Sequence, residues 1–379
     1  MRFEPMPVNP EVIRWARAHA GFSLDDVRDT FKKIEVWEAG EASPTYPQIE
    51  RLADKFRIPV AVFFFPEPPD VPPITESFRT LPEHELELMP PRMRLLLRKA
   101  KAYQLNLFDL TGGTNPSAKS ITRDLSFNTN VSITTMVRRV RQYLDVSIEE
   151  QSSWSNAAIA SENWRNILAN VGVSVFKDAF RIPNYWGFCL YDSEFPIIYV
   201  NNSSSKTRQI FTLFHELAHL IFHTSGIDTL NDDFIAHLPE DEKKIEIICN
   251  RFAAEFLLPE DVFDEAFAGK SADENTAEEL ASQFHVSREV IYRKFLDRNL
   301  IDETTYRRAA SRWASQRSQG GSGGDFYNTK MSYLGTDYIN LAFSQYYQNR
   351  IDDSQLAEYL NVKPLHLGTL EDYVLKGRA

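Results

Sequence analysis

The chain has 379 residues, 43% of them hydrophobic, which is enough for two or three domains with well-filled cores. It contains no apolar run of eighteen residues, and its first residues lack the charged-then-apolar layout of a signal peptide, so we expect a cytoplasmic protein with no membrane partner. The formal net charge of −11 excludes a general attraction to nucleic acid, so any contact with DNA must be local. Cys189 and Cys249 lie in apolar surroundings and are expected to be reduced core residues.

Residues 1–65 are predicted to form several short helices. Asn9 before Pro10, and Ser23 before an amphipathic stretch, are typical helix starts. The segment EVWEAGEASPT resembles the W-E-x-G-x-x-x-P pattern of the lambda-repressor-like (XRE) helix-turn-helix family, which implies a DNA-binding module. Between Ser23 and Trp37 the chain is about four residues shorter than in that family, and the loss falls on the turn and the start of the recognition helix. The region holds nine basic and ten acidic side chains, so DNA binding and a role in protein contacts both remain open.

A proline-rich connector follows at residues 66–82, where six prolines predict a stiff, extended segment. Residues 83–300 are predicted to form the central region, in which amphipathic helices are followed by a small group of strands. The helices are expected at residues 91–110, 132–144 and 147–170, and the strands are VSVF, WGFCLY and PIIYV. This composition of elements predicts an α+β, mostly helical fold.

A cluster of arginines and one of the strands in this region carry further predictions. The basic residues Arg138, Arg139 and Arg141 are expected on a solvated helix face rather than in a nucleic-acid patch. The strand at residues 197–200 is expected at the edge of the sheet, where backbone pairing could hold an extended substrate.

Residues 207–223, TRQIFTLFHELAHLIFH, are predicted to form a buried helix, because apolar side chains occupy nearly every side of it. His215 and His219 of the H-E-x-x-H pattern project from one helix face, close enough to bind a single zinc ion. Glu216 lies beside them, where it can take a proton from a water that the metal activates and pass it to a leaving amine. The alternative is a core helix with histidines bonded to backbone, but burying these three groups without a partner would be costly. His223 is expected to bond to backbone or to support a ligand, outside the metal set.

A catalytic zinc site needs a third protein ligand and one open position. A second helix is predicted at residues 240–258, and Glu246 is the acid at the point where this helix turns apolar. Asn250 shares its face one turn later and could orient the carboxylate. We therefore favour Glu246 as a ligand over one more solvated acid, and three further candidates are Asp232, Asp233 and His237.

These two helical patterns together resemble the ImmA/IrrE metallo-endopeptidases. That family has an F-T-x-x-H-E-x-x-H-x-x-x-H helix followed by an E-x-x-A-N-x-F-A-A-x-x-L-x-P helix, compared with RQIFTLFHELAHLIFH and EIICNRFAAEFLLP here. Cys249 stands where alanine is usual. The resemblance covers residues 160–300 and implies a zincin-like core, with Zn²⁺ as cofactor, Glu216 as catalytic acid and base, and three zinc ligands: His215, His219 and Glu246.

The resemblance also implies a narrow protein substrate, usually a helix-turn-helix repressor that is cut at one bond. Cleavage would then release transcription of a stress, mobile-element or toxin–antitoxin operon. A second hypothesis, from another functional class, is a non-proteolytic DNA-binding regulator or antitoxin that uses its zinc core for partner binding or sensing. Metal-dependent cleavage would separate the two, whereas zinc content alone would not.

The remaining parts of the chain are predicted from composition and helix signals. The peptidase core is expected at residues 160–270, followed at 275–300 by a helix-turn-helix-like unit. This unit serves either base readout or structural packing and partner docking. Residues 311–325, rich in glycine and serine, are predicted to be a flexible linker. Residues 326–379 are predicted to form a C-terminal helical module whose sequence indicates no function.

Overall fold

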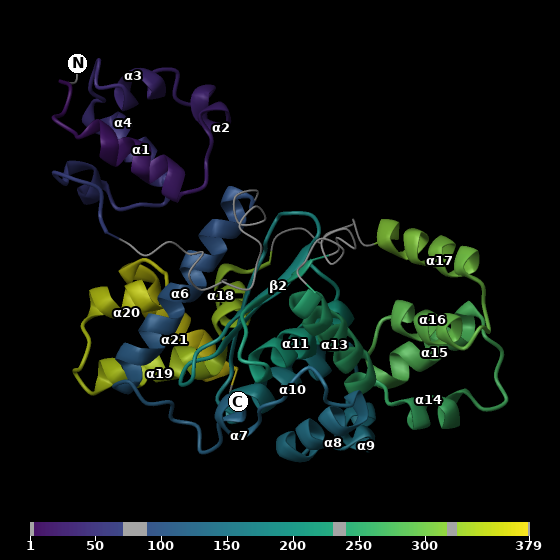
Figure 1. The fold of residues 1–379 in the computed structure, drawn as a ribbon. Coiled ribbons are helices and arrows are strands. Elements are labelled where there is room, and N and C mark those ends of the chain that lie inside the picture. The colour runs from purple at the N-terminus through teal and green to yellow at the C-terminus, as the bar shows by residue number, and fades with distance from the viewer. Residues whose placement is uncertain (1–3, 71–88, 230–239, 317–323, 378–379) are drawn as a thin grey trace. The chain divides into compact units, whose positions relative to one another are not determined.

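The computed structural model describes residues 4–70, 89–229, 240–316 and 324–377 (Figure 1). The chain divides into two compact units, Met1–Lys99 and Ala100–Ala379, with the boundary inside helix α6 (Pro91–Thr111). No helix in the described ranges is both long and apolar enough to cross a membrane. The chain is mostly helical with one small mixed sheet, so the predicted α+β fold class is confirmed.

The first unit contains the short helices that the sequence predicted. They are α1 (Pro10–His19), α2 (Leu24–Arg28), α3 (Ile34–Glu38), α4 (Tyr46–Phe56) and the 3₁₀-helix η1 (Val60–Phe64). The Asn9 side chain accepts a hydrogen bond from the Glu11 backbone N–H, and Ser23 forms a capping box with Asp26, as expected for helix starts. Their apolar faces share one core, in which Trp37 is 3% exposed.

Helix α3, which stands where a recognition helix would lie, is only five residues long. Its two acids are both engaged within the unit. Glu35 pairs with Arg28 at 2.7 Å, and Glu38 pairs with Arg17 at 2.7 Å in a largely buried contact. Helix α3 therefore contributes negative charge and no basic side chain of its own, which disfavours base readout by this helix.

The second unit is built on a four-stranded sheet in the order β1 (Ser174–Asp178), β3 (Ile197–Asn201), β2 (Tyr185–Leu190), β4 (Gly226–Thr229). Strand β3 runs parallel to β1, and the other two pairings are antiparallel. The prediction that residues 197–200 form an edge strand is wrong, because β3 lies between β1 and β2. The edge next to β2 is β4, a strand of four residues that is too short to show an alternating pattern.

Helices cover both faces of this sheet (Figure 1). On one face, α10 (Ala157–Asn170) packs on β1, and α11 (Lys206–Ile221) packs on β2 and β3. On the other, the Phe176 ring of β1 lies 4.5 Å from the Tyr103 ring of α6 and 5.1 Å from the Tyr338 ring of α19 (Thr336–Tyr347). The C-terminal module, for which the sequence indicated no role, thus contributes to the core on the second face of the sheet.

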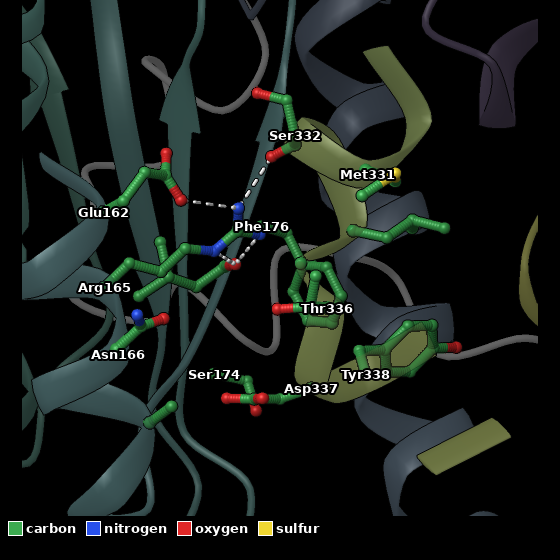
Figure 2. A pocket seen from close by; sticks show the side chains of 14 residues that line it. Glu162, Arg165, Asn166, Ser174, Phe176, Met331, Ser332, Thr336, Asp337 and Tyr338 are labelled. Atoms are coloured by element: carbon green, nitrogen blue, oxygen red, sulfur yellow. Dashed lines mark hydrogen bonds and ion pairs between the residues drawn. The ribbon is translucent and has the colours of Figure 1, made fainter. Parts of the chain in front are cut away.

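Arg165 of α10 connects this module to the sheet (Figure 2). Its buried guanidinium donates hydrogen bonds to the backbone carbonyls of Val175 in β1 and of Ser332 and Tyr333 at the end of α18 (Phe326–Leu334). The close approach requires Gly335, which has φ +85° and where a Cβ would lie 2.8 Å from the Arg165 guanidinium. These contacts border a cavity of about 230 Å³ between α10, β1 and the α18–α19 corner.

Arg165→Met should loosen α18 from the sheet. Three carbonyls would lose a charged donor, and we expect a loss of about 3 kcal/mol in the local free energy of opening. Hydrogen exchange of the α18 amides measures this directly, and the expected result is faster exchange than in the wild type. Arg139→Met is the matched control because Arg139 is exposed. Equal α18 protection in the two variants would contradict this account of Arg165.

The described part of the second unit contains further helices. They are α7 (Ile121–Asp124), α8 (Ile133–Leu144), α9 (Ile148–Ser153), α13 (Glu240–Leu257), α14 (Glu260–Phe267), α15 (Glu274–Phe284), α16 (Arg288–Asp297), α17 (Glu303–Gln316), α20 (Asp353–Tyr359), η3 (Pro364–His366) and α21 (Leu367–Lys376). Arg138 and Arg139 are exposed as predicted, but Arg141 is not on a solvated face. It donates to the Phe256 carbonyl at the end of α13, which a local charge pattern could not indicate.

The helix-turn-helix-like unit α15–α16 has its basic side chains committed to acids of the same unit and its neighbours. Arg288 pairs with Glu278, Lys294 with Glu255, and Arg298 just past α16 with Asp264. Helix α17 packs on α16. This arrangement favours the packing interpretation over base readout.

The linker was predicted to begin at residue 311, but the structure is helical as far as Gln316. Helix α17 continues to Gln316, because Trp313 is 3% exposed and its ring lies 4.8 Å from Tyr292 of α16. A single buried tryptophan therefore outweighs the polar composition around it. The glycine-rich remainder of that stretch lies mostly outside the described residues.

Candidate metal centre

Helix α11 carries the H-E-x-x-H pattern on a fully buried turn. His215, Glu216 and His219 are exposed by 1%, 0% and 3%. Because the histidines are four residues apart, both rings leave the same face of the helix, and their Nε2 atoms lie 3.3 Å apart. The sequence pattern and the local geometry therefore agree at these positions.

Helix α13 brings Glu246 to this pair. It packs along α11 through the Phe214 and Phe256 rings, whose centroids lie 4.1 Å apart, and through the small buried Ala253. One carboxylate oxygen of Glu246 lies 3.1 Å from His219 Nε2, and the other lies 3.5 Å from His215 Nε2. The structure thus brings together the three residues that the sequence analysis favoured as ligands.

The three donor groups have the spacing that a small tetrahedral ion requires. Zinc binds imidazole nitrogen and carboxylate oxygen at about 2.0–2.1 Å, so two of its ligand atoms lie about 3.3 Å apart in a tetrahedron. The contacts between the donor atoms here are 3.1, 3.3 and 3.5 Å. Two histidines and one glutamate are also the donor set of open, catalytic zinc sites. The residues present therefore fit a zinc ion.

Two polar side chains hold the imidazole rings from behind. His215 Nδ1 lies 3.1 Å from the Asn250 amide oxygen, and His219 Nδ1 lies 3.3 Å from the Thr224 hydroxyl oxygen. A proton on each Nδ1 leaves the Nε2 lone pair free for a metal. Asn250 was expected to orient Glu246, and it instead contacts His215. The sequence analysis did not predict the role of Thr224. The feature that could have indicated it is a hydroxyl residue directly after the helix that carries the H-E-x-x-H pattern.

Asn250→Ala should weaken metal binding without removing a ligand. The His215 ring would lose the acceptor that holds it, and loss of such an outer partner typically lowers metal affinity by about 10- to 100-fold. Competition with a chromogenic zinc chelator measures the change. A Gln209→Ala variant alters a buried amide at the start of α11, away from the cluster, and should leave the affinity unchanged. Equal affinities for the Asn250 variant and the wild type would contradict this role.

The electrostatics of the cluster suit a cation. Burial lowers the pKa of His215 and outweighs the nearby carboxylates. Burial also acts to lower the pKa of His219, but Cys249 and Glu246 beside it raise that pKa above its ordinary value. The histidines in turn hold the pKa of Glu246 below its usual range, although burial acts to raise it. The histidines thus favour the ionised form of the Glu246 carboxylate, which is the form that binds a metal ion.

Glu216 differs from Glu246 in its contacts. No hydrogen bond of normal geometry reaches either of its buried carboxylate oxygens in the described part of the chain, although the Cys189 thiol lies beside it and acts to lower its pKa. Burial raises the pKa of Glu216 to about 8. A buried carboxylate without such a hydrogen bond is costly, which indicates that a ligand or water completes this position.

A further buried acid, Asp228 of β4, was not predicted. It is 4% exposed and accepts hydrogen bonds from Arg208 at 2.6 Å and from the Thr212 hydroxyl at 2.8 Å. Arg208 and Thr212 share the α11 face that carries His215 and His219 two turns later. No local pattern points to Asp228, because its partners are about 20 residues away in the chain.

The other candidates do not join the cluster within the described residues. Asp232, Asp233 and His237 lie outside the residues that the structure describes. His223 Nε2 lies 2.9 Å from the Thr122 carbonyl oxygen, so it bonds to the backbone as expected. None of the cluster residues lines the cavity of Figure 2.

The region that contains the candidate metal centre is similar to a known protein family. Residues 169–296 match the model of peptidase M78, described as the IrrE N-terminal-like domain. The chain therefore contains an IrrE N-terminal-like domain. The match includes the sheet, α11 and α13, and so spans the whole candidate metal centre.

Two curated proteins are similar to part of the chain. The radiation response metalloprotease IrrE of Deinococcus radiodurans is 33% identical over 133 residues, which is 35% of this chain and 39% of that protein. The protein of the same name from Deinococcus deserti is 33% identical over 99 residues, which is 26% of this chain and 34% of that protein. The chain thus aligns with little more than a third of either relative.

Proposed function

We propose that the chain is a zinc-dependent endopeptidase. The observation that carries this proposal is the triangle of His215, His219 and Glu246 donor atoms next to the buried carboxylate of Glu216. The IrrE N-terminal-like domain and the two relatives named metalloproteases support it.

The three ligands and Glu216 have separate tasks in this proposal. Zinc, when bound, supplies a Lewis acid that polarises the scissile carbonyl and makes water more acidic. Glu216 accepts a proton from the attacking water as its oxygen bonds to the carbonyl carbon, and it donates that proton to the amine as the C–N bond breaks. Asn250 and Thr224 keep the imidazole rings oriented throughout.

The substrate that we propose is a specific regulatory protein, either a helix-turn-helix repressor or a toxin–antitoxin partner. Its cleavage would control transcription of a stress, mobile-element or toxin–antitoxin operon. Support comes from the family resemblance and from the two Deinococcus relatives, which are named radiation response metalloproteases. The alternative of a non-proteolytic DNA-binding regulator is less well supported, because α3 is short and acidic and the basic residues around α16 are paired with acids.

Incubation of the zinc-loaded protein with the repressor-type and toxin-type proteins encoded beside its gene tests the proposal. Mass spectrometry of the products should find one or a few discrete cleavage sites in one of them. Cutting should stop with a zinc chelator and return with added zinc. Tight co-elution with a partner that stays intact under all of these conditions would favour the regulator.

A further inference from the structure

Trp186 occupies a β-bulge of strand β2 where it pairs with the edge strand β4, whose first residue, Gly226, lies against His219. Tyr185 of β2 pairs with Thr229 of β4, and Gly187 pairs with Asp228, so Trp186 between them has no partner in β4. Bulges of this kind re-aim one side chain and are frequent next to active sites. Here the indole ring is directed onto the guanidinium of Arg208, whose Cζ atom lies 5.0 Å from the ring centroid.

Strand β4 follows the metal face of α11. Gly226 lies against His219 so closely that a Cβ would be 2.6 Å from the ring, and Asp228 bonds to Thr212 and Arg208 further along the helix. Arg208 precedes His215 by seven residues, which is about 10 Å along a helix axis. Arg208 and Trp186 therefore lie at one end of a row that begins at the metal ligands.

Both side chains hold a donor without an acceptor. Arg208 gives one nitrogen to Asp228, but its Nε and the Trp186 Nε1 are buried and have no hydrogen-bond partner among the described residues. A buried donor of this kind destabilises the fold unless an acceptor reaches it. Trp164 Nε1 is also unpartnered, but that ring is fully enclosed in the core, whereas the Arg208 side chain is 22% exposed.

The charges around Arg208 indicate which chemical group could accept hydrogen bonds from the Arg208 Nε–H and the Trp186 Nε1–H. Asp228 already neutralises Arg208, and the Glu246 carboxylate lies at the metal end of the same row. A further carboxylate would add negative charge to this group, whereas a neutral carbonyl oxygen would satisfy the donors without changing it. A distance of about 10 Å corresponds to about three residues of extended peptide.

We propose that Trp186 and Arg208 bind a main-chain carbonyl of the substrate about three residues from the scissile bond. This inference rests on the proposed function, because the metal centre defines where the scissile bond lies. A contact with a main-chain carbonyl does not depend on the substrate side chain. It would therefore fix the position of the peptide relative to the metal centre rather than select a residue type.

Peptide hydroxamates test this inference because the hydroxamate anchors on the metal and the peptide extends from it. We would titrate zinc-loaded protein with acetohydroxamate and with hydroxamates that carry one to four alanines on either side, and measure Kd by calorimetry. One series extends on one side of the hydroxamate and the other series on the opposite side. In one of them, addition of the second, third or fourth alanine should raise the affinity of the wild type about fivefold over the next shorter compound. Trp186→Phe keeps the stacked ring but removes its N–H, and it should lose most of that gain.

Further variants separate this role from a structural one. Arg208→Lys keeps the ion pair with Asp228 but lacks Nε, and it should also lose the gain, with the Kd for acetohydroxamate unchanged. Trp164→Phe is the matched control in the core and should keep the gain. Absence of a gain in both series, or an equal gain in Trp186→Phe, overturns the subsite alone. Failure of acetohydroxamate to bind the zinc-loaded wild type overturns the metal centre and the subsite together.

Discussion

Glu216→Gln is expected to lower the rate of peptide cleavage by about a thousandfold while zinc binding stays intact, since positioned acid–base groups contribute about 10²- to 10⁴-fold. Glutamine preserves the shape of the side chain and cannot take a proton from water. Glu216 does not belong to the ligand triangle, so the zinc content should match the wild type. Time courses of substrate cleavage and metal analysis on the same preparation measure both quantities.

The control for this variant is Glu240→Gln, the same chemical change at an exposed position in the first turn of α13. It should cleave at the wild-type rate. A Glu216→Gln variant that cuts the substrate as fast as the wild type would show that another group moves the proton. Loss of zinc from that variant would instead indicate that Glu216 holds the metal.

Glu246→Ala is expected to lower zinc affinity by more than about a hundredfold, and cleavage should fall with it. Removal of a direct ligand must cost more than removal of an outer partner such as Asn250, for which about 10- to 100-fold is typical. Isothermal titration with zinc, in the presence of a competing chelator, measures the affinity. The variant leaves the two histidines as the only protein ligands, whereas a catalytic zinc site has three.

Asp241→Ala, at an exposed position on the same helix, serves as the matched control and should bind zinc as the wild type does. If Glu246→Ala also retained the wild-type affinity, another acid would have to supply the third ligand. The candidates Asp232, Asp233 and His237 would then be the first to substitute.

The sequence was most informative where the signal is local. The spacing of His215 and His219 depends only on helix geometry, and Glu246 stands at a change of hydrophobicity that is visible within its own helix. The structure places all three side chains together because α11 and α13 pack through apolar faces that the periodicity also predicted.

The sequence was least informative where the partners are far apart in the chain. Strand β4 has only four residues and becomes recognisable by pairing with β2, so the edge of the sheet was assigned to the wrong strand. Tyr338 and Tyr103 flank Phe176 from helices more than 200 residues apart, which gave no local indication that the C-terminal module covers the sheet. Asp228 and Thr224 depend on tertiary contacts in the same way.

Anomalous diffraction at the zinc edge, from crystals of the zinc-loaded protein, tests the central claim most directly. We predict one zinc peak at about 2.0–2.1 Å from His215 Nε2, His219 Nε2 and a Glu246 carboxylate oxygen, with no fourth protein ligand. A peak at another place in the chain, a Glu246 side chain turned away from the histidines, or a protein side chain in the fourth position would contradict it.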